Sequence, residues 1–352
     1  MTQPTPTPSS APGTAPAGET PLVEIAGLKT HFFTEDGVVK AVDGVDLTIR
    51  PNRTLCILGE SGCGKSIMAR SILRIVDAPG RIVDGSIVYR AEDGRSVDLA
   101  KARPTSREVR QIRGKDIAMI FQEPMSSLGP IQKIGHQIVE TILLHRRMSK
   151  AEAKRTAIEM LDRVGIPNPA QRFEAYPFEL SGGMRQRAMI AMALSCQPRL
   201  LIADEPTTAL DVTTQAQILD LIADLKDEFD MSVMLITHDL GVVAEVAEEV
   251  AVMYMGRVVE EGDVYSVFEN PQHPYTRALL KSVPRIGVTT AARLPAIEGM
   301  VPHPLARPSG CPFRTRCESV IEGVCSKAQP ALVPVGPTKV ACFLHSDATT
   351  DD

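Results

Sequence analysis

The chain has 352 residues, and its hydrophobic and charged fractions, 43% and 23%, are those of an ordinary globular protein. This length suits one large domain or two and allows a sizeable core. The net charge of −5 gives no support for nucleic acid as the main partner. No apolar run is long enough to span a bilayer, and the N-terminus lacks the basic and apolar regions of a secretory signal. We therefore expect a globular, cytoplasmic protein.

Residues 1–18 contain no charged side chain and are rich in Pro, Thr, Ser and Ala. Such a composition cannot form a core, so we expect a disordered tail over residues 1–20. Strand-like segments follow at Leu22–Phe33 and Lys40–Ile49, and a further β element is predicted at Gly85–Arg90. These antiparallel-type segments precede and follow a glycine-rich stretch.

That stretch reads GESGCGKS and has the form G-x-x-x-x-G-K-[ST] of a phosphate-binding loop. A buried strand is predicted before it at Leu55–Leu58 and a helix after it at Ile67–Ile75. The glycines let successive backbone N–H groups point at one anion, and the helix N-terminus adds partial positive charge. Lys65 is expected to reach the β- and γ-phosphates, and the Ser66 hydroxyl to ligate Mg²⁺. The predicted triphosphate site comprises Gly59, Glu60, Ser61, Gly62, Cys63, Gly64, Lys65 and Ser66.

Beyond the loop, short apolar runs alternate with segments of helical periodicity. Runs bounded by polar residues are typical of strands in a parallel sheet that is covered on both faces. After Phe268 prolines recur and the periodicity is lost, which predicts a domain boundary near Val264–Glu269. The predicted elements are strands at Ile117–Phe121, Leu200–Ala203, Val233–Ile236, Val250–Tyr254 and Arg257–Glu260, and helices within Ile134–Gly165 and at Thr214–Phe229 and Gly241–Glu248.

Two acidic residues follow one of these strands. The run Leu200–Ala203 ends in Asp204 and Glu205, at the carboxyl end of the strand, where ligands bind in open α/β sheets. A phosphate loop needs carboxylate support for its Mg²⁺. We expect Asp204 to hold the ion through water and Glu205 to act as general base on the attacking water.

A second glycine-containing stretch, Leu180–Arg187, reads LSGGMRQR and leads into an apolar and basic helix. It predicts another anion-binding helix N-terminus. One ATP cannot occupy two such sites that lie far apart, so this one is expected to cap an ATP held by a partner subunit. The stretch resembles the signature motif of ABC-transporter ATPases, and the resemblance extends over about Leu22 to Gly262. It assigns the contacts with the partner's ATP to Ser181, Gly182, Gly183 and Gln186.

The same resemblance implies roles for further residues. Gln122 in FQEP resembles the Q-loop glutamine, which contacts Mg²⁺ or the attacking water. Asp211 in TTALD resembles the D-loop residue, which communicates across the subunit interface. His238 in LITHD resembles the switch histidine, which contacts the γ-phosphate. Phe32 or Phe33 resembles the aromatic that stacks on adenine, although either one suits an ordinary strand position equally well.

The family resemblance also implies an architecture and a set of partners. It predicts an α/β, ABC-type P-loop ATPase core with an antiparallel β subdomain and a helical insertion. Two ATPase subunits, here expected to be related but non-identical chains, associate head-to-tail. ATP is then held between the phosphate loop of one subunit and the signature of the other. Two transmembrane permease subunits and an extracytoplasmic substrate-binding protein complete the assembly. The chain is accordingly expected at the cytoplasmic face of the bacterial plasma membrane, with ATP and Mg²⁺ as cofactors.

The segment Phe268–Leu280, FENPQHPYTRALL, resembles one found in the dipeptide/oligopeptide importer branch of the family. GESGCGKS, FQEPMSSL and YPFELSGG fit the same branch, whereas Gly129 stands where the branch usually has Asn. The resemblance implies an ATPase subunit of a peptide importer. Uptake of nickel or another small solute is an alternative, and a soluble, non-transport ABC ATPase is a more distant one.

Four cysteines gather in the last tenth of the chain, spaced C-x5-C-x7-C-x16-C. In a reducing compartment such a group favours a metal site over disulfides. Paired C-x2-C knuckles, typical of zinc, are missing, and four thiolates on irregular loops suit an iron–sulfur cluster at least as well. Related importers carry a [4Fe–4S] cluster in this extension, so the resemblance favours that cluster, with Zn²⁺ as the first alternative and unligated cysteines as the second. His345 is close enough in sequence to compete as a ligand, although it fits an ordinary surface histidine better. The proposed ligands are Cys311, Cys317, Cys325 and Cys342.

Composition and motifs together predict the division of the chain. The ATPase domain precedes a small cysteine-containing extension, and a tail closes the chain. The predicted ranges are 1–20 for the first tail, 21–265 for the ATPase domain with its helical part at about 125–190, 266–345 for the extension and 346–352 for the last tail.

Overall fold

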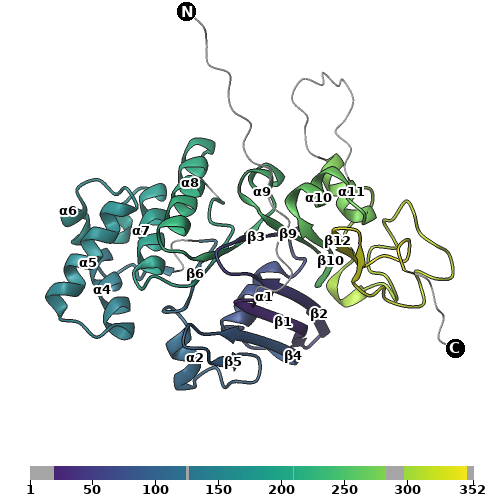
Figure 1. Ribbon diagram of the computed structural model, residues 1–352, viewed down its shortest axis with the longest axis horizontal. Helices are drawn as coiled ribbons and strands as arrows, with labels where there is room; N and C mark the ends of the chain where they lie inside the picture. The colour runs from purple at the N-terminus through teal and green to yellow at the C-terminus, as the bar shows by residue number, and fades with distance from the viewer. Residues whose placement is uncertain (1–19, 124–126, 209, 283–296, 347–352) are drawn as a thin grey trace, which may run out of the picture.

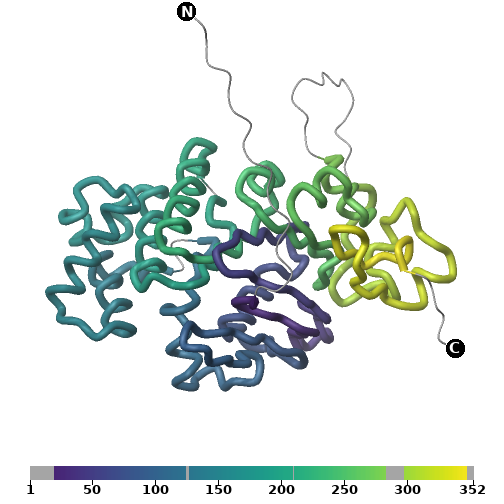
Figure 2. Tube along the Cα trace, in the orientation of Figure 1, coloured from purple at the N-terminus to yellow at the C-terminus, as the bar shows by residue number. Residues whose placement is uncertain are grey.

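The computed structural model describes residues 20–123, 127–208, 210–282 and 297–346. Its elements form a central sheet, a smaller antiparallel sheet beside it and a helical insertion (Figure 1). The insertion and the C-terminal extension lie at opposite ends of the molecule, with the central sheet between them (Figure 2). This arrangement confirms the predicted α/β fold. The tails predicted at 1–20 and 346–352 lie outside the described residues, apart from residues 20 and 346.

The central sheet carries the glycine-rich loop. Within the described ranges it has eight strands. Its order is β11 (Val333–Val335), β12 (Thr338–Val340), β10 (Arg257–Asp263), β9 (Glu249–Tyr254), β3 (Thr54–Leu58), β8 (Ser232–Thr237), β7 (Leu200–Asp204) and β6 (Ile117–Ile120). Strands β9, β3, β8, β7 and β6 run parallel, and β10, β12 and β11 extend the sheet by antiparallel pairing. The six predicted strands of this sheet, β3 and β6 to β10, are all present.

Each parallel strand is buried on both faces. Along β3, Cys56 and Leu58 face one apolar core, and Leu55 and Ile57 face the other. The first core is shared with the helical insertion and the C-terminal extension, and the second with the antiparallel sheet. Because neither face is solvated, polar residues do not alternate with apolar ones. This is why the strands appear in the sequence as uninterrupted apolar runs.

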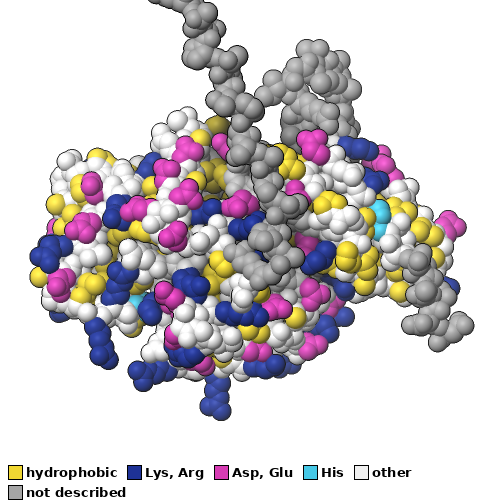
Figure 3. All heavy atoms as spheres, viewed as in Figure 1, with side chains coloured by type: hydrophobic (Ala, Val, Ile, Leu, Met, Phe, Trp, Pro, Cys, Tyr) yellow, Lys and Arg dark blue, Asp and Glu magenta, His cyan; other side chains and the backbone are white. Residues whose placement is uncertain are grey.

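The antiparallel sheet has the order β2 (Gly37–Ile49), β1 (Val23–Thr34), β4 (Gly80–Arg90) and β5 (Ser96–Asp98). It packs against helix α1 (Lys65–Ile72), where the buried hydroxyl oxygens of Thr30 and Ser71 lie 2.8 Å apart. Since α1 begins in the glycine-rich loop, this contact fixes the direction in which the chain leaves the loop. On the face shown in Figure 3, the basic and acidic side chains of the described residues are interspersed.

The helical insertion consists of α4 (Ile134–His145), α5 (Lys150–Arg163), α6 (Pro169–Phe173) and α7 (Gly182–Leu194). Helix α5 starts with a capping box, in which Ser149 and Glu152 each bond the backbone N–H of the other. Gly135 allows α6 to approach α4 closely, because a Cβ there would lie 2.1 Å from the ring of Phe173. The capping box thus starts α5 as a separate helix, and the absence of a side chain at Gly135 lets α4 and α6 pack closely.

The elements beyond β7 alternate as expected, with α8 (Val212–Glu228) after β7 and α9 (Leu240–Val246) after β8. Beyond Phe268 the chain has more regular secondary structure than its irregular sequence pattern predicts. Helix α10 (Val264–Glu269) crosses the predicted boundary, α11 (Pro274–Lys281) follows it, and strands β11 and β12 of the extension complete the edge of the central sheet. The proposed boundary at 265/266 stays a prediction. No helix in the described ranges combines the length and apolar character that crossing a membrane requires.

Candidate nucleotide-binding site

The glycine-rich loop connects β3 to α1, as predicted. Gly59, Gly62 and Gly64 all have positive φ values, which L side chains adopt only with strain. A Cβ would lie 2.3 Å from the Met253 carbonyl oxygen at Gly59, and 2.1 Å from that of Ala41 at Gly64. The loop is thus pressed between β9 and β2, and only glycine fits these two positions. The loop leads directly into the N-terminus of α1, where an anion is favoured.

Lys65 is buried at the start of α1. Its Nζ donates hydrogen bonds to the carbonyl oxygens of Gly59, at 2.7 Å, and Glu60, at 3.1 Å. The ammonium group therefore lies over the glycine-rich loop that precedes α1. Its predicted contact with the β- and γ-phosphates stays a prediction.

Ser66 and Asp204 form the candidate Mg²⁺ site. The Ser66 hydroxyl donates to Asp204 Oδ1 across 2.9 Å, although the two residues are far apart in the sequence. Hydroxyl and carboxylate oxygens are the kinds of group that bind Mg²⁺ and its waters, so this pair agrees with a site in which Ser66 ligates the ion and Asp204 holds it through water. Burial, and to a lesser degree the charge of Glu205, raise the pKa of Asp204, whereas the bond from Ser66 lowers it.

Glu205 is the centre of a second group of contacts. Its Oε2 accepts hydrogen bonds from Gln122 Nε2, at 3.0 Å, and from the Thr208 hydroxyl, at 2.9 Å. Its Oε1 lies 3.4 Å from Nδ1 of His238. Gln122, Glu205 and His238 follow β6, β7 and β8, so the carboxyl ends of three adjacent parallel strands bring them together.

The geometry gives the two carboxylate oxygens of Glu205 different tasks. Oε2 accepts two hydrogen bonds, whereas the contact of Oε1 among the described residues is with His238, whose side chain is 64% exposed. A water beside His238 could therefore transfer a proton to Oε1. The backbone supports this position, since Glu205 has a φ of 47° and its N–H donates to the Ile236 carbonyl on β8. Thr208 was not expected from the sequence, where its only signal is its position three residues after Glu205.

The signature stretch lies elsewhere. Ser181 caps α7, with its hydroxyl accepting a bond from the N–H of Met184. Gln186 donates to the Pro206 carbonyl, and a Cβ at Gly183 would lie 3.1 Å from Thr214 on α8. Asp211 caps α8 through its own bond from the Thr214 N–H. Among the described residues no hydrogen bond joins Ser181, Gly182 or Gly183 to the phosphate loop, whereas the signature and the D-loop are packed together.

The two candidate aromatic residues differ in their surroundings. The ring of Phe32 packs against Gly80, where a Cβ would be 2.6 Å from its Cε1 atom. The ring of Phe33 is covered by the guanidinium of Arg81, 4.1 Å from its centroid. Phe33 is 38% exposed. Both rings lie at the tip of the β1–β2 hairpin.

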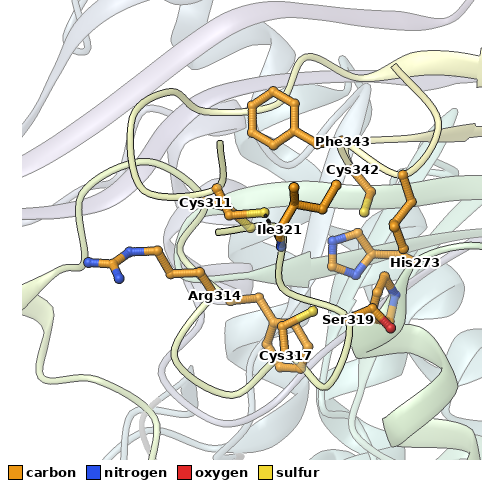
Figure 4. Close-up of a pocket in the computed structure, with 12 residues that line it drawn as sticks. His273, Cys311, Arg314, Cys317, Ser319, Ile321, Cys342 and Phe343 are labelled. Carbon is orange, nitrogen blue, oxygen red and sulfur yellow. Dashed lines mark hydrogen bonds between the residues drawn. The ribbon is translucent and has the colours of Figure 1, made fainter. Parts of the chain in front are cut away.

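The four cysteines of the extension line one pocket together with His273 (Figure 4). Cys311 N–H donates to the Cys325 carbonyl, and Ile321 N–H donates to Cys325 Sγ at 3.4 Å. Burial raises the pKa of Cys311 to about 11 and lowers that of His273 to about 3. Nε2 of His345 lies 3.2 Å from the Gln272 carbonyl oxygen.

The donor types fit a thiolate-ligated metal group, but the spacing is loose. Within the described ranges, no three His, Cys, Asp or Glu side chains are close enough to hold a metal ion. The cavity measures about 10 Å³, which is roughly the space of one water. The structure thus brings the four predicted cysteines to one place without forming a ligand shell.

Comparisons with known proteins agree with this geometry. Residues 42–208 match the ABC transporter family, and residues 259–325 match the oligopeptide/dipeptide transporter C-terminal region. A Brucella melitensis protein named as a peptide import ATP-binding protein is 51% identical, over 90% of this chain and 94% of its own. A Sinorhizobium fredii protein named as a peptide ABC transporter ATP-binding protein is 49% identical, over 93% and 95%.

Solved structures give the same result. A dimeric ATP-binding cassette in a post-hydrolysis state, bound to ADP and Pi, has a TM-score of 0.60 and 26% identity, covering 69% of this chain and 98% of its own. The CbiO1 component of an ABC transporter complex from Clostridium perfringens has a TM-score of 0.58 and 25% identity, covering 72% and 92%. The chain therefore belongs to the ABC transporter family of ATPases, in the group that carries the oligopeptide/dipeptide transporter C-terminal region.

Proposed function

We propose that the chain is the ATP-hydrolysing subunit of a bacterial ABC importer for di- and oligopeptides. The meeting of Glu205, Gln122 and His238 beside the phosphate loop supports the enzymatic part most directly. The C-terminal region at 259–325 and the names of the relatives support peptide cargo. The same architecture would also serve an importer of nickel or another small solute.

The proposed site divides the chemistry among few residues. Lys65 and the loop amides bind the phosphates, while Ser66, Asp204 and Gln122 hold Mg²⁺. The bound ion neutralises charge on the β- and γ-phosphates. Glu205 accepts a proton from the attacking water at Oε1, since its Oε2 is already occupied.

Two further contacts with ATP complete the proposal. His238 reaches the γ-phosphate from its exposed position next to Glu205. Phe32 stacks on adenine, and the more exposed Phe33 is the alternative. Replacing each ring in turn by Ala and measuring the Kd for MgATP would identify the stacking residue.

A second ATPase subunit is needed because the signature stretch does not reach the phosphate loop of its own chain. In a head-to-tail dimer, Ser181, Gly182 and Gly183 would meet the partner's ATP, and Asp211 would lie at the interface. The predicted contact of Gln186 with that ATP conflicts with the structure, since its side chain is buried and donates to the Pro206 carbonyl. The dimeric cassette among the similar structures supports this arrangement. We propose a related, non-identical chain as the partner.

The membrane partners are proposed to be two permease subunits, supplied with cargo by an extracytoplasmic binding protein. The chain would bind them from the cytoplasmic face. The helical insertion presents exposed apolar side chains on its surface, among them Leu144, 76% exposed, and Phe178. Such side chains suit a protein interface better than water. Co-purification with permeases, as opposed to co-sedimentation with ribosomes, would separate transport from the soluble, non-transport alternative.

The test of the enzymatic proposal is Glu205→Gln in the purified membrane assembly. We expect ATP turnover to fall at least about a hundredfold, because the proton acceptor is lost, while MgATP still binds. Glu159→Gln, on the exposed side of α5, is the matched control and should retain full turnover. Full turnover of the Glu205→Gln assembly would exclude Glu205 as the general base.

For the extension, we propose that Cys311, Cys317, Cys325 and Cys342 hold a [4Fe–4S] cluster, with Zn²⁺ as the alternative. Their shared pocket supports this. Iron, sulfide and zinc should be measured in the full-length protein purified without oxygen. Cys317→Ser should lower the metal content, whereas Cys196→Ser, at a buried cysteine between α7 and β7, should not. A wild-type chain without iron or zinc would refute both metals.

A further inference from the structure

One residue of the phosphate loop, Glu60, is held by the C-terminal extension through both its backbone and its side chain. Its N–H donates to the Tyr275 hydroxyl oxygen at 3.0 Å. Its carboxylate accepts bonds from both terminal nitrogens of Arg316, at 2.7 and 3.1 Å. The extension is therefore in direct contact with the loop that binds the triphosphate.

Tyr275 determines the orientation of a peptide plane that Lys65 also uses. The N–H of Glu60 and the carbonyl of Gly59 belong to the same peptide group, and in a trans peptide they point in opposite directions. Tyr275 holds the N–H side, while Nζ of Lys65 bonds the carbonyl side at 2.7 Å. Rotation of this plane would therefore remove a bond from Tyr275 and move the ammonium group of Lys65.

The contacts of Arg316 hold its side chain in one conformation. Only 3% of its side chain is exposed, and its two parallel bonds to Glu60 are the arrangement in which a guanidinium holds a carboxylate most rigidly. Its Nε donates to the Glu298 carbonyl, and its guanidinium lies 5.9 Å from the ring centre of Tyr254. A long side chain with these contacts loses little further freedom when ATP binds.

The surroundings of the two residues are rigid as well. The rings of Tyr254, Tyr275 and Phe313 contact one another, with centroids 4.7 to 5.3 Å apart. Tyr254 ends β9, Tyr275 is on α11, and Phe313 lies between Cys311 and Arg316. This aromatic cluster connects the segment of the cysteines to the central sheet, next to the loop.

We propose that Arg316 and Tyr275 are positioning residues for nucleotide binding, which hold Glu60 so that the phosphate loop and Lys65 are arranged before ATP arrives. The proposal rests on the proposed function of the loop as the ATP site. It assigns to the C-terminal extension a part in the ATPase site itself. Without these contacts, ordering the loop would be a cost of binding, and affinity would fall.

The test measures the Kd for MgADP by calorimetry with the full-length chain, because ADP occupies the loop without being hydrolysed. Arg316→Gln should raise this Kd about tenfold, which corresponds to ~1.4 kcal/mol. Arg316→Lys, which keeps one charged contact, should recover part of the affinity. Arg314→Gln is the matched control, since Arg314 contacts Ser309 and extends away from the cysteines in Figure 4.

Tyr275→Phe removes only the hydroxyl oxygen and decides the question if Arg316→Gln does not fold. We expect its Kd for MgADP to rise about fivefold, because the N–H of Glu60 loses its partner. If Arg316→Gln folds, an unchanged Kd for MgADP in that variant would refute the proposal. If Arg316→Gln does not fold, an unchanged Kd in Tyr275→Phe would refute it. Absence of MgADP binding by the wild-type chain would instead refute the proposed function.

Discussion

Asp204 combines a chemical role with a cost to the fold. It is 3% exposed at the end of β7, and the positive charges of Arg70 and Lys65 only partly offset the cost of its burial. Burial raises its pKa, so the folded chain binds a proton at Asp204 more tightly than the unfolded chain does. The free energy of unfolding therefore decreases as the pH rises from the unfolded pKa through the folded one. At neutral pH the buried charge is destabilising until a cation binds.

This argument predicts opposite effects of Asp204→Asn on stability and on activity. Without nucleotide or Mg²⁺ at pH 7, the variant should unfold at a higher temperature, by about 1–2 °C for each kcal/mol gained. Thermal unfolding of the full-length chain checks this. Mg²⁺-dependent ATP turnover of the variant should be lost. Asp220→Asn, at an exposed position on α8, should change neither quantity, and a lower unfolding temperature for Asp204→Asn would contradict the argument.

The contacts of single residues show where inference from sequence ends. Glu205, Gln122 and His238 were predicted from motifs, and the structure brings them together. Thr208 and Arg316 were not predicted, although both bond to predicted site residues. The partner of Arg316 is distant in the sequence, so nothing in the sequence around Arg316 indicates the contact. Thr208 lies three residues after Glu205, but a threonine at that spacing does not by itself indicate that its hydroxyl bonds the carboxylate.

Strands and helices were predictable to the degree that burial controls their composition. The parallel strands β3, β7 and β8 are covered on both faces and stand out as apolar runs. Strands β11 and β12 have three residues each and form because β10 offers an edge. An element of three residues has no periodicity to detect, so pairing across the chain rather than local pattern creates it.

Within the helical insertion, the contact between α4 and α6 gives a stability prediction. Gly135→Ala places a methyl group where the ring of Phe173 lies, at 2.1 Å from Cδ2. Since Phe173 is buried and cannot move freely, we expect a loss of about 1–3 kcal/mol in unfolding free energy. Denaturant unfolding followed by circular dichroism measures it. Gly182→Ala, where an added Cβ meets nothing within 4 Å, should leave stability nearly unchanged, and an equal loss there would contradict the steric explanation.

At the scale of the whole molecule, the phosphate loop and the signature stretch, the two proposed halves of a nucleotide site, lie on different parts of the chain. The phosphate loop sits on the central sheet, with the C-terminal extension against its outer side. The signature begins α7 in the helical insertion, towards the opposite end of the molecule (Figure 1). Nucleotide binding and ATP turnover are therefore expected to depend on different surfaces of the chain. One substitution should be able to impair turnover without weakening binding.

Ser181→Arg is predicted to separate ATP turnover from nucleotide binding. The added side chain would block the partner's ATP at the N-terminus of α7 but would not touch the chain's own loop. In the purified assembly ATP turnover should fall at least about tenfold, whereas the Kd of the isolated full-length chain for MgADP should stay unchanged. Ser96→Arg, at an exposed position on β5, serves as control and should preserve both values. A weakened Kd for Ser181→Arg would mean that signature and loop interact within one chain, and the head-to-tail arrangement would have to be abandoned.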